Sequence, residues 1–351
     1  MDSHKTFRPS RRAVVAGAAA GLAAFAVPML RAQTKPEKAL VRLSVGDKSS
    51  LYHLPLTIAE RLGFFAASDL DVQISDFGTG AGALQALLSG RVDVCAGTFK
   101  HTLSLQSRNQ YCTSFVLEGR APQVVVGVSL RNLPDYRSLD DLRNKRIGVS
   151  ALGATTHMAA SLLMSRANLR PGDVTFVPVG LGDSAASALH TGLVDGIATL
   201  DPLITQLEQR GDVCVVLDTR TLKDTRALFG GPMPGGCLYA PEAFIRQRPR
   251  TTQALADGIV RALKWLQTAG PGDIIKAVPP AYLQNDRALY VAAFQKVREA
   301  ISPDGIVPDD GPATVLRVAS GFEPDLAAAH IELGRLFTND FARRAKERFE
   351  A

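Results

Sequence analysis

The sequence predicts an α/β protein with two lobes, each built on a mainly parallel sheet flanked by helices. Its 351 residues suggest two domains of ordinary size, and 46% of them are hydrophobic, enough for a core in each. From residue 41 onward, short apolar runs alternate with stretches of helical periodicity, the pattern of β-α units. The chain also repeats itself, because residues 77–98 (FGTGAGALQALLSGRVDVCAGT) match residues 179–200 (VGLGDSAASALHTGLVDGIATL) at a constant offset of 102.

The first lobe opens with a short apolar run that predicts a strand. The helical pattern that follows stops at Gly63, because glycine readily adopts the left-handed conformation found after helix ends. The same alternation then continues for two more units. We expect strands at Val41–Val45, Asp71–Ser75 and Arg91–Ala96, and helices at Leu54–Leu62, Gly82–Leu88 and Leu103–Arg108.

The chain is predicted to cross between the lobes twice. Val124–Leu130, a run rich in β-branched residues, predicts a long buried strand that leaves the first lobe. After the turn-rich segment Gly230–Gly236, the strand Cys237–Ala240 carries the chain back. The first lobe is then discontinuous, formed by residues 40–125 and 240–351, and the second lobe is formed by residues 126–239. Its expected strands are Arg146–Ser150, Val174–Val179, Val194–Thr199 and Val213–Leu217, and its expected helices are Thr155–Ala167, Ser184–Thr191 and Leu203–Arg210.

Beyond residue 241 the pattern is helical. In Thr251–Thr268 the apolar residues fall on one face, which predicts an amphipathic helix packed on a core. Three further segments, Ala288–Ala300, Pro312–Ser320 and Phe337–Lys346, predict helices that pack outside the first lobe.

The first 32 residues resemble an export signal. A polar start is followed by Arg11-Arg12, an Ala/Gly/Val/Leu run as far as Leu30, and an expected cleavage position near Ala32. The arginine pair favours a twin-arginine signal, and a general secretory leader is the alternative. We therefore expect a periplasmic protein. The formal net charge is +6, but the leader holds five basic residues and one acidic residue, and the remaining +2 does not indicate nucleic-acid binding.

The four cysteines lie at positions 95, 112, 214 and 237. None of them form a C-x-x-C pair, and their spacing is not that of a metal-binding site. Cys95 and Cys112 could form a disulfide in an oxidising compartment. Both lie in or beside apolar strand-like runs, which favours buried free thiols. We expect neither a metal nor a cofactor.

The repeated segment has a physical role at the end of a strand. A G-x-G turn lets the backbone approach whatever lies above the sheet, and the following helix begins with unpaired N–H groups directed to the same place. Such a helix start attracts an anionic or carbonyl oxygen. Two copies, one in each lobe, would face each other across a cleft. Gly90 and Gly192 are interpreted as helix stops, and Asp93 and Asp195 as local caps that do not reach a ligand.

Four segments of this sequence resemble the nitrate/sulfonate/taurine-type substrate-binding proteins of ABC importers. They are Pro55–Phe65 (PLTIAERLGFF), Leu70–Thr98, Ser138–Thr156 (SLDDLRNKRIGVSALGATT) and Leu169–Pro202, in that order. The resemblance implies a two-lobed type II periplasmic-binding-protein fold, with two crossover strands at the hinge, that closes over one small molecule. It also implies an inner-membrane ABC permease as partner and a monomeric chain.

Carried over residue by residue, the resemblance places the ligand-binding loops at strand ends in both lobes. Asp201 could instead cap the helix that follows it. Likewise, hydroxyl side chains at helix starts more often cap the helix than contact a ligand. A carboxylate at Asp201 would repel a sulfonate unless an amine lay between them. The sequence therefore leaves three kinds of ligand open: an amino sulfonate, a carboxylate or a pyrimidine-like heterocycle. The expected ligand-binding residues are Ser49, Ser50, Leu51, Tyr52, Gly78, Thr79, Gly80, Thr98, Gly153, Ala154, Thr155, Thr156, Asp201, Gly236 and Cys237.

An enzyme on the same two-lobed fold, a lyase or a relative of pyrimidine synthases, is the alternative function. The synthase resemblance depends on a dense cysteine cluster that this sequence lacks, and neither G-x-S-x-G nor H-E-x-x-H occurs. His53 and Asp201 are the candidate bases, and the sequence names no partner for either. A solute-binding protein without catalytic residues is therefore the expected function.

Overall fold

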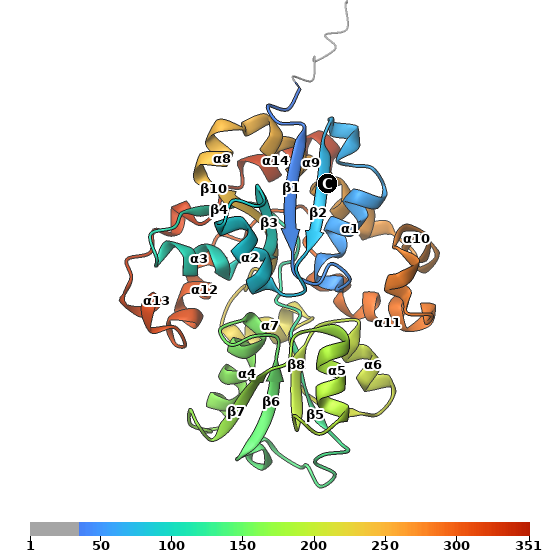
Figure 1. Cartoon of the computed structure of the whole chain (residues 1–351), viewed down its shortest axis with the longest axis vertical. Helices are drawn as coiled ribbons and strands as arrows, with labels where there is room; N and C mark the ends of the chain where they lie inside the picture. Colours follow the sequence, from blue (N-terminus) through green and yellow to red (C-terminus); the bar gives the residue numbers. More distant parts are fainter. Residues whose placement is uncertain (1–34) are drawn as a thin grey trace, which may run out of the picture. The chain divides into compact units, whose positions relative to one another are not determined.

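The computed structural model describes residues 35–351, of which Pro36–Ala351 form one compact unit (Figure 1). The expected export signal at residues 1–32 lies outside the described residues. Within the described unit are two five-stranded sheets flanked by helices, and no helix there is long and apolar enough to cross a bilayer. The two-lobed α/β fold that the sequence predicts is confirmed.

The first sheet has the strand order β2-β1-β3-β10-β4. Strands β1, β2 and β3 pair in parallel, and β10 pairs antiparallel with both β3 and β4. Four strands of the sheet therefore run in one direction and one runs against them. The strands of this sheet are β1 Leu40–Val45, β2 Asp71–Asp76, β3 Val94–Thr98, β4 Cys112–Leu117 and β10 Gly236–Pro241.

The second sheet repeats this topology in the order β7-β6-β8-β5-β9. Here β6 pairs in parallel with β7 and β8, and β5 is the strand that runs against the others. In each sheet the antiparallel strand is the one that enters from the other lobe. The strands of the second sheet are β5 Val125–Ser129, β6 Lys145–Val149, β7 Val174–Pro178, β8 Gly196–Thr199 and β9 Val213–Asp218.

Helices cover both sheets, and the longest, α9, packs on α1 and α14 in the core of the first lobe. The described helices are α1 Leu54–Arg61, α2 Gly80–Leu88, α3 Lys100–Gln106, α4 Thr155–Arg166, α5 Gly182–His190, α6 Leu203–Gln209, α7 Leu222–Phe229, α8 Glu242–Gln247, α9 Pro249–Thr268, α10 Pro271–Ala277, α11 Arg287–Val297, α12 Gly311–Ser320, α13 Pro324–Ala328 and α14 Asp340–Phe349.

The sequence repeat is a structural repeat. Gly78 and Gly180 both have positive φ angles, of 69° and 74°, and the helix of each copy begins two residues later. Gly90 and Gly192 follow the helix ends with φ angles of 70° and 73°, which confirms them as helix stops.

The two repeated aspartates also have matching local roles. Asp93 Oδ2 accepts the backbone N–H of Arg42 at 3.0 Å, and Asp195 Oδ2 accepts that of Arg146 at 2.9 Å. Each carboxylate therefore fastens the start of one strand to the neighbouring strand. Their expected local role agrees with these hydrogen bonds, and that neither contacts a ligand stays a prediction.

The structure differs from the expected elements in several places. The elements β4, α7, α8, α10 and α13 are additional to those expected from the sequence. Because β10 pairs with β3 and β4, it belongs to the first sheet from Gly236 onward. The boundaries at 125/126 and 239/240 remain a proposal for the division of the lobes. The C-terminal helices also reach beyond the first sheet, since α11 contacts α6 of the second lobe.

Candidate functional site

A cavity of about 490 Å³ lies where strands of the two sheets end. Gly46 follows β1, Thr98 ends β3, Ser150 follows β6 and Leu200 follows β8, and all four residues line the cavity. Ligands of open α/β sheets bind at the carboxyl ends of the strands, where the loops leave the sheet. The fold therefore directs loops from both lobes to one enclosed space.

Nine of the fifteen expected ligand-binding residues line this cavity, and the other six lie outside its lining. Leu51 is fully buried in the core of the first lobe, and Gly236 and Cys237 are buried within β10. Gly236 has a supporting role, because a Cβ atom there would lie 3.0 Å from Cε1 of Tyr52. The expected residues in the lining are Ser50, Tyr52, Thr79, Gly80, Thr98, Gly153, Ala154, Thr155 and Thr156, and those outside it are Ser49, Leu51, Gly78, Asp201, Gly236 and Cys237.

Two sets of hydrogen bonds join the lobes beside the cavity. The hydroxyl oxygens of Thr98 and Thr155 lie 3.2 Å apart. On the neighbouring side, the backbone carbonyl of Asp201 accepts the N–H of Leu51 at 3.1 Å and the hydroxyl of Ser50 at 3.2 Å. The loops expected to bind the ligand thus also hold the two lobes together.

The two threonines at the start of α4 have different roles. Thr156 is buried, and its hydroxyl oxygen accepts the backbone N–H of Ser150 at 3.0 Å. Thr155 is the first residue of the helix and lines the cavity beside the N–H groups of the first turn. Helix starts carry partial positive charge, so this wall suits an oxygen-rich group of a ligand. Thr156 holds the loop, and Thr155 faces the cavity.

His53 has a buried carboxylate partner that the sequence did not reveal. Its Nδ1 lies 3.2 Å from Oε2 of Glu118, and both side chains are at least 95% buried. The second oxygen of Glu118 and the hydroxyl of Tyr52 are buried without a hydrogen-bond partner among the described residues. Burial raises the pKa of Tyr52, so its phenol stays neutral. The floor of the cavity therefore combines the imidazole of His53 with the phenol of Tyr52, and the carboxylate of Glu118 contacts the imidazole from outside the lining.

His101 lines the cavity next to this floor, and its Nδ1 lies 2.8 Å from the hydroxyl of Tyr239. Burial, and then the positive charge of Lys100, lower the pKa of His101 to about 3. The imidazole is accordingly neutral at physiological pH, and it contributes polarity without charge to the cavity.

We expect the imidazole C–H resonances of His101 to show no titration between pH 4.5 and 8, because the folded protein holds the ring neutral over that range. Stability linked to His101 is full above the unfolded-state pKa and is lost as the pH falls below it, since the unfolded chain then binds the proton. A proton NMR titration of the folded protein tests this. A midpoint for His101 near 6 would contradict it.

One wall of the cavity comes from a segment that the sequence analysis did not connect with the site. Phe322, Glu323, Pro324 and Asp325 all line the cavity, between α12 and α13. The carboxylate of Glu323 pairs with the buried ammonium of Lys100 and accepts the hydroxyl of Ser104 at 3.0 Å. The position of Lys100 and His101 directly after Thr98 could have placed them in the site. No local signal connects residues 322–325 with it.

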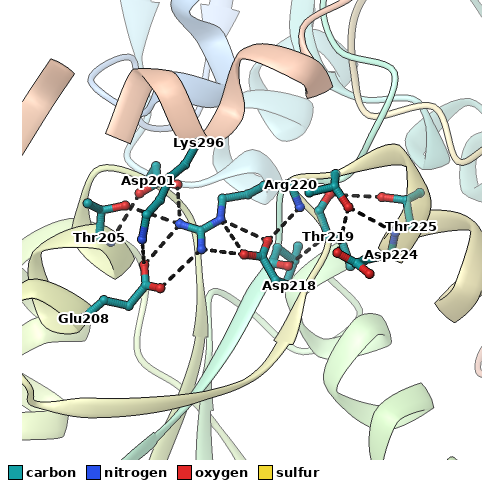
Figure 2. Close-up of polar contacts among 11 residues, drawn as sticks. Asp201, Thr205, Glu208, Asp218, Thr219, Arg220, Asp224, Thr225 and Lys296 are labelled. Carbon is teal, nitrogen blue, oxygen red and sulfur yellow. Dashed lines mark hydrogen bonds and ion pairs between the residues drawn. The ribbon is translucent and has the colours of Figure 1, made fainter. Parts of the chain in front are cut away.

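Asp201 lies outside the cavity because its carboxylate is held by Arg220 (Figure 2). Oδ2 lies 3.2 Å from Nη1 of Arg220, and Oδ1 accepts the backbone N–H of Thr205 at 3.2 Å. Burial raises the pKa of Asp201, although Arg220 and the hydrogen bonds oppose it. The expected repulsion of an anionic ligand by Asp201 is thus countered by a cation that the sequence analysis overlooked.

Arg220 is the centre of a larger network, drawn in Figure 2. Its guanidinium contacts the carboxylates of Asp201, Glu208 and Asp218 at 3.2, 3.2 and 2.5 Å. Burial disfavours its charge, but these hydrogen bonds and charges prevail and raise the pKa of Arg220. Glu208 also pairs with Lys296 of α11 at 2.7 Å, which is a third contact between the lobes.

The four cysteines carry free thiols, and Cys95, Cys112 and Cys237 are buried. Burial raises the pKa of Cys95 to about 11 and that of Cys112 to about 12, so these thiols stay protonated and unreactive. Within residues 35–351, no group of three or more His, Cys, Asp or Glu side chains is arranged to hold a metal ion.

The chain has the fold of periplasmic binding proteins, with a cavity between the strand ends of the two lobes. The alkanesulfonate-binding protein SsuA from Xanthomonas axonopodis pv. citri, solved with bound MOPS, matches with a TM-score of 0.64. It is 17% identical, and the match covers 86% of this chain and 99% of that one. The model of the family described as NMT1/THI5 like matches residues 50–269, and the chain belongs to that family.

The chain is also similar to three other proteins. A solved structure from Bordetella bronchiseptica RB50 is 48% identical with a TM-score of 0.86, covering 90% of this chain and 100% of that one. YtlA of Bacillus subtilis (strain 168) is 20% identical over 285 residues, 79% of this chain and 82% of YtlA. A shorter match, 27% over 146 residues, is to the 4-amino-5-hydroxymethyl-2-methylpyrimidine phosphate synthase of Schizosaccharomyces pombe, and covers 41% of this chain and 40% of the synthase.

Proposed function

We propose that this protein is the solute-binding component of an ABC importer and captures one small organic molecule in the cavity between its lobes. The observation that carries the proposal is the cavity itself, which is lined by strand ends of both sheets and bridged by Thr98 and Thr155. The match to a sulfonate-binding protein supports the class of function.

The proposed ligand is anionic or zwitterionic, such as a sulfonate or carboxylate with an apolar body. The start of α4 and the hydroxyl of Thr155 suit an oxyanion. Leu84, Leu152 and Leu200 offer an apolar surface to the remainder of the molecule. A volume of about 490 Å³ is in the range of pockets for organic ligands and exceeds what an inorganic oxyanion fills.

The proposed mechanism is hinge closure. A ligand that touches Thr98 of the first lobe and Thr155 of the second makes both contacts only when the lobes are together, so it selects the closed form. The contacts of Asp201 with Ser50 and Leu51, and of Glu208 with Lys296, stabilise the same arrangement. The closed form is what the permease would recognise.

The proposal includes export to the periplasm by the leader expected at residues 1–32, an inner-membrane permease as partner, and function as a monomer without a cofactor. Similarity to periplasmic binding proteins supports this setting.

The ligand is expected to copurify with the chain, because closure encloses it on both sides. Native mass spectrometry should show an adduct that denaturation releases and whose mass identifies it. Thr155→Ala is expected to weaken the affinity for the released compound about ten-fold, the loss of one hydrogen bond to a charged group. Calorimetry measures that change.

Thr156→Ala is the matched comparison, because Thr156 holds the loop through Ser150. It should lower the unfolding midpoint more than Thr155→Ala does, and its direct effect on affinity should be smaller. Unchanged affinity in Thr155→Ala would contradict the proposed orientation of the ligand, and a chain that binds no small molecule would contradict the function.

An enzyme is the second candidate, and the pair formed by His53 and Glu118 favours it. A carboxylate that fixes an imidazole beside a cavity is the arrangement of a general base. Incubation of the purified chain with the copurified compound distinguishes the two functions, because a binding protein returns the compound unchanged. A product that disappears in His53→Gln would establish the enzyme.

A further inference from the structure

A second cavity, of about 660 Å³, lies beside the first and is here called the arginine groove. It lies among α4, α7 and α12, and in Figure 1 α7 lies between the levels of α12 above and α4 below. Phe322 lines both cavities. Its lining includes Arg166, Arg170, Arg317, Phe176, Phe229 and Phe322.

The groove has three positive charges and no acidic residue in its lining. Arg166 donates to the backbone carbonyls of Ala227 and Leu228, and Arg317 donates to that of Phe229 at 2.9 Å. These carbonyls do not neutralise a guanidinium. Among the described ion pairs none involves the arginines of the groove, in contrast to Arg220 with its three carboxylates. Asp173, which lies just outside the lining, accepts the backbone N–H of Arg170 at 2.8 Å and pairs with Arg143 at 2.5 Å. The three arginines of the lining therefore outnumber the one nearby carboxylate, and the groove keeps an excess of positive charge.

Arg170 is the arginine of the groove with its donors free. It is exposed, and within residues 35–351 its guanidinium has neither a hydrogen bond nor an ion pair. Phe176 and Phe229 contribute aromatic surface to the same groove, and Leu169 and Met164 are buried beside it. A guanidinium suits a carboxylate or sulfonate through paired N–H donors, and the phenylalanines suit a flat apolar body.

We propose that the arginine groove is a second ligand site, which takes an organic anion with an aromatic or other apolar body. Its volume lies within the range of small-molecule pockets. A protein partner would need a larger surface than one groove provides, since stable interfaces bury more than about 1,000 Å² in total. The site is separate from the cavity of the proposed function, and it does not depend on that function.

Calorimetry with 2-naphthoate and 2-naphthamide tests the proposal, because the two probes share a shape and differ in charge. The full mature chain should bind naphthoate and bind naphthamide much more weakly. Arg170→Gln should weaken naphthoate binding about five-fold or more, the effect of losing one charged hydrogen bond at a partly exposed position. Arg170→Lys keeps the positive charge but loses the planar guanidinium. Its affinity for naphthoate should therefore lie between those of the wild type and Arg170→Gln.

Arg210→Gln is the matched control, because Arg210 is an exposed arginine that lines neither cavity. It should leave naphthoate binding unchanged. The proposal is overturned if Arg170→Gln and Arg210→Gln weaken naphthoate binding equally, because the effect is then a general electrostatic attraction to the positively charged protein. It is also overturned if Thr98→Ala with Thr155→Ala abolishes naphthoate binding, since the probe would then occupy the first cavity. Naphthoate that fails to bind overturns it as well, and leaves an acidic protein segment as the occupant to test.

Discussion

Replacement of Arg220 by methionine is expected to lower the free energy of unfolding by about 3–5 kcal/mol, the cost of removing one partner from a buried ion pair. The side chain of Arg220 is 3% exposed and that of Asp201 is fully buried, so the variant leaves a carboxylate without a cation and out of reach of water. Glu208 and Asp218 are more exposed and recover water more easily. Urea unfolding at pH 7 measures the change.

The pH dependence of this variant gives a second measurement. Arg220 lowers the pKa of Asp201 against the effect of burial, so its loss leaves that pKa further above the ordinary value. The folded variant then holds a proton on Asp201 more tightly than the unfolded chain does. The difference in the free energy of unfolding between the wild type and Arg220→Met should therefore become smaller as the pH falls from 8 to 5. Arg220→Met with Asp201→Asn, which removes the buried charge as well, should cost less than Arg220→Met alone. Equal deficits at the two pH values would contradict this account.

Gly46→Ala should both destabilise the fold, by about 3 kcal/mol, and abolish ligand capture. A Cβ atom at Gly46 would lie 2.2 Å from the carbonyl carbon of Thr79 and 2.4 Å from the backbone nitrogen of Gly80. Backbone atoms cannot rotate away as a side chain does, so the turn must move, which is overpacking of a tight site. That turn lines the cavity and starts α2. Chemical denaturation and calorimetry with the copurified compound measure the two effects.

Gly80→Ala is the matched control for this change. Gly80 also lines the cavity, but a Cβ atom there would meet only Cε1 of His101, at 3.7 Å, which is an ordinary contact. The first position of a helix accepts alanine, so stability should change by less than about 1 kcal/mol. Equal losses of stability in the two alanine variants would show that the close approach at Gly46 is not the cause.

The repeated segments show how much of this fold the sequence determined by itself. The G-x-G turns, the helix stops and the alternation of strand and helix depend on residues within one or two turns of each other. Local backbone preference acts at that range, so Gly78 and Gly180 adopt the predicted conformation. The same local patterns placed Thr79, Thr98 and Thr155 at strand and helix ends, and these residues do line the cavity.

Other elements carry little local signal. Strand β4 is buried along its whole length and α13 has only five residues, so neither alternation nor helical periodicity marks them. The direction of each loop side chain is also decided by its packing. Ser50 therefore lines the cavity while its neighbours Ser49 and Leu51 do not, although the sequence predicts all three as ligand-binding residues.

The chemistry of the site was decided by tertiary structure. His53 meets Glu118 across 65 residues, Lys100 meets Glu323 across 223, and Arg220 neutralises Asp201 from the end of another strand. No local sequence pattern predicts which buried charges pair. The packing of distant segments removes water from the charged groups and brings each one to its partner. The sequence alone thus determined two similar lobes with loops at their strand ends, and the folded chain decided which side chains line the cavity and which of their charges are already neutralised.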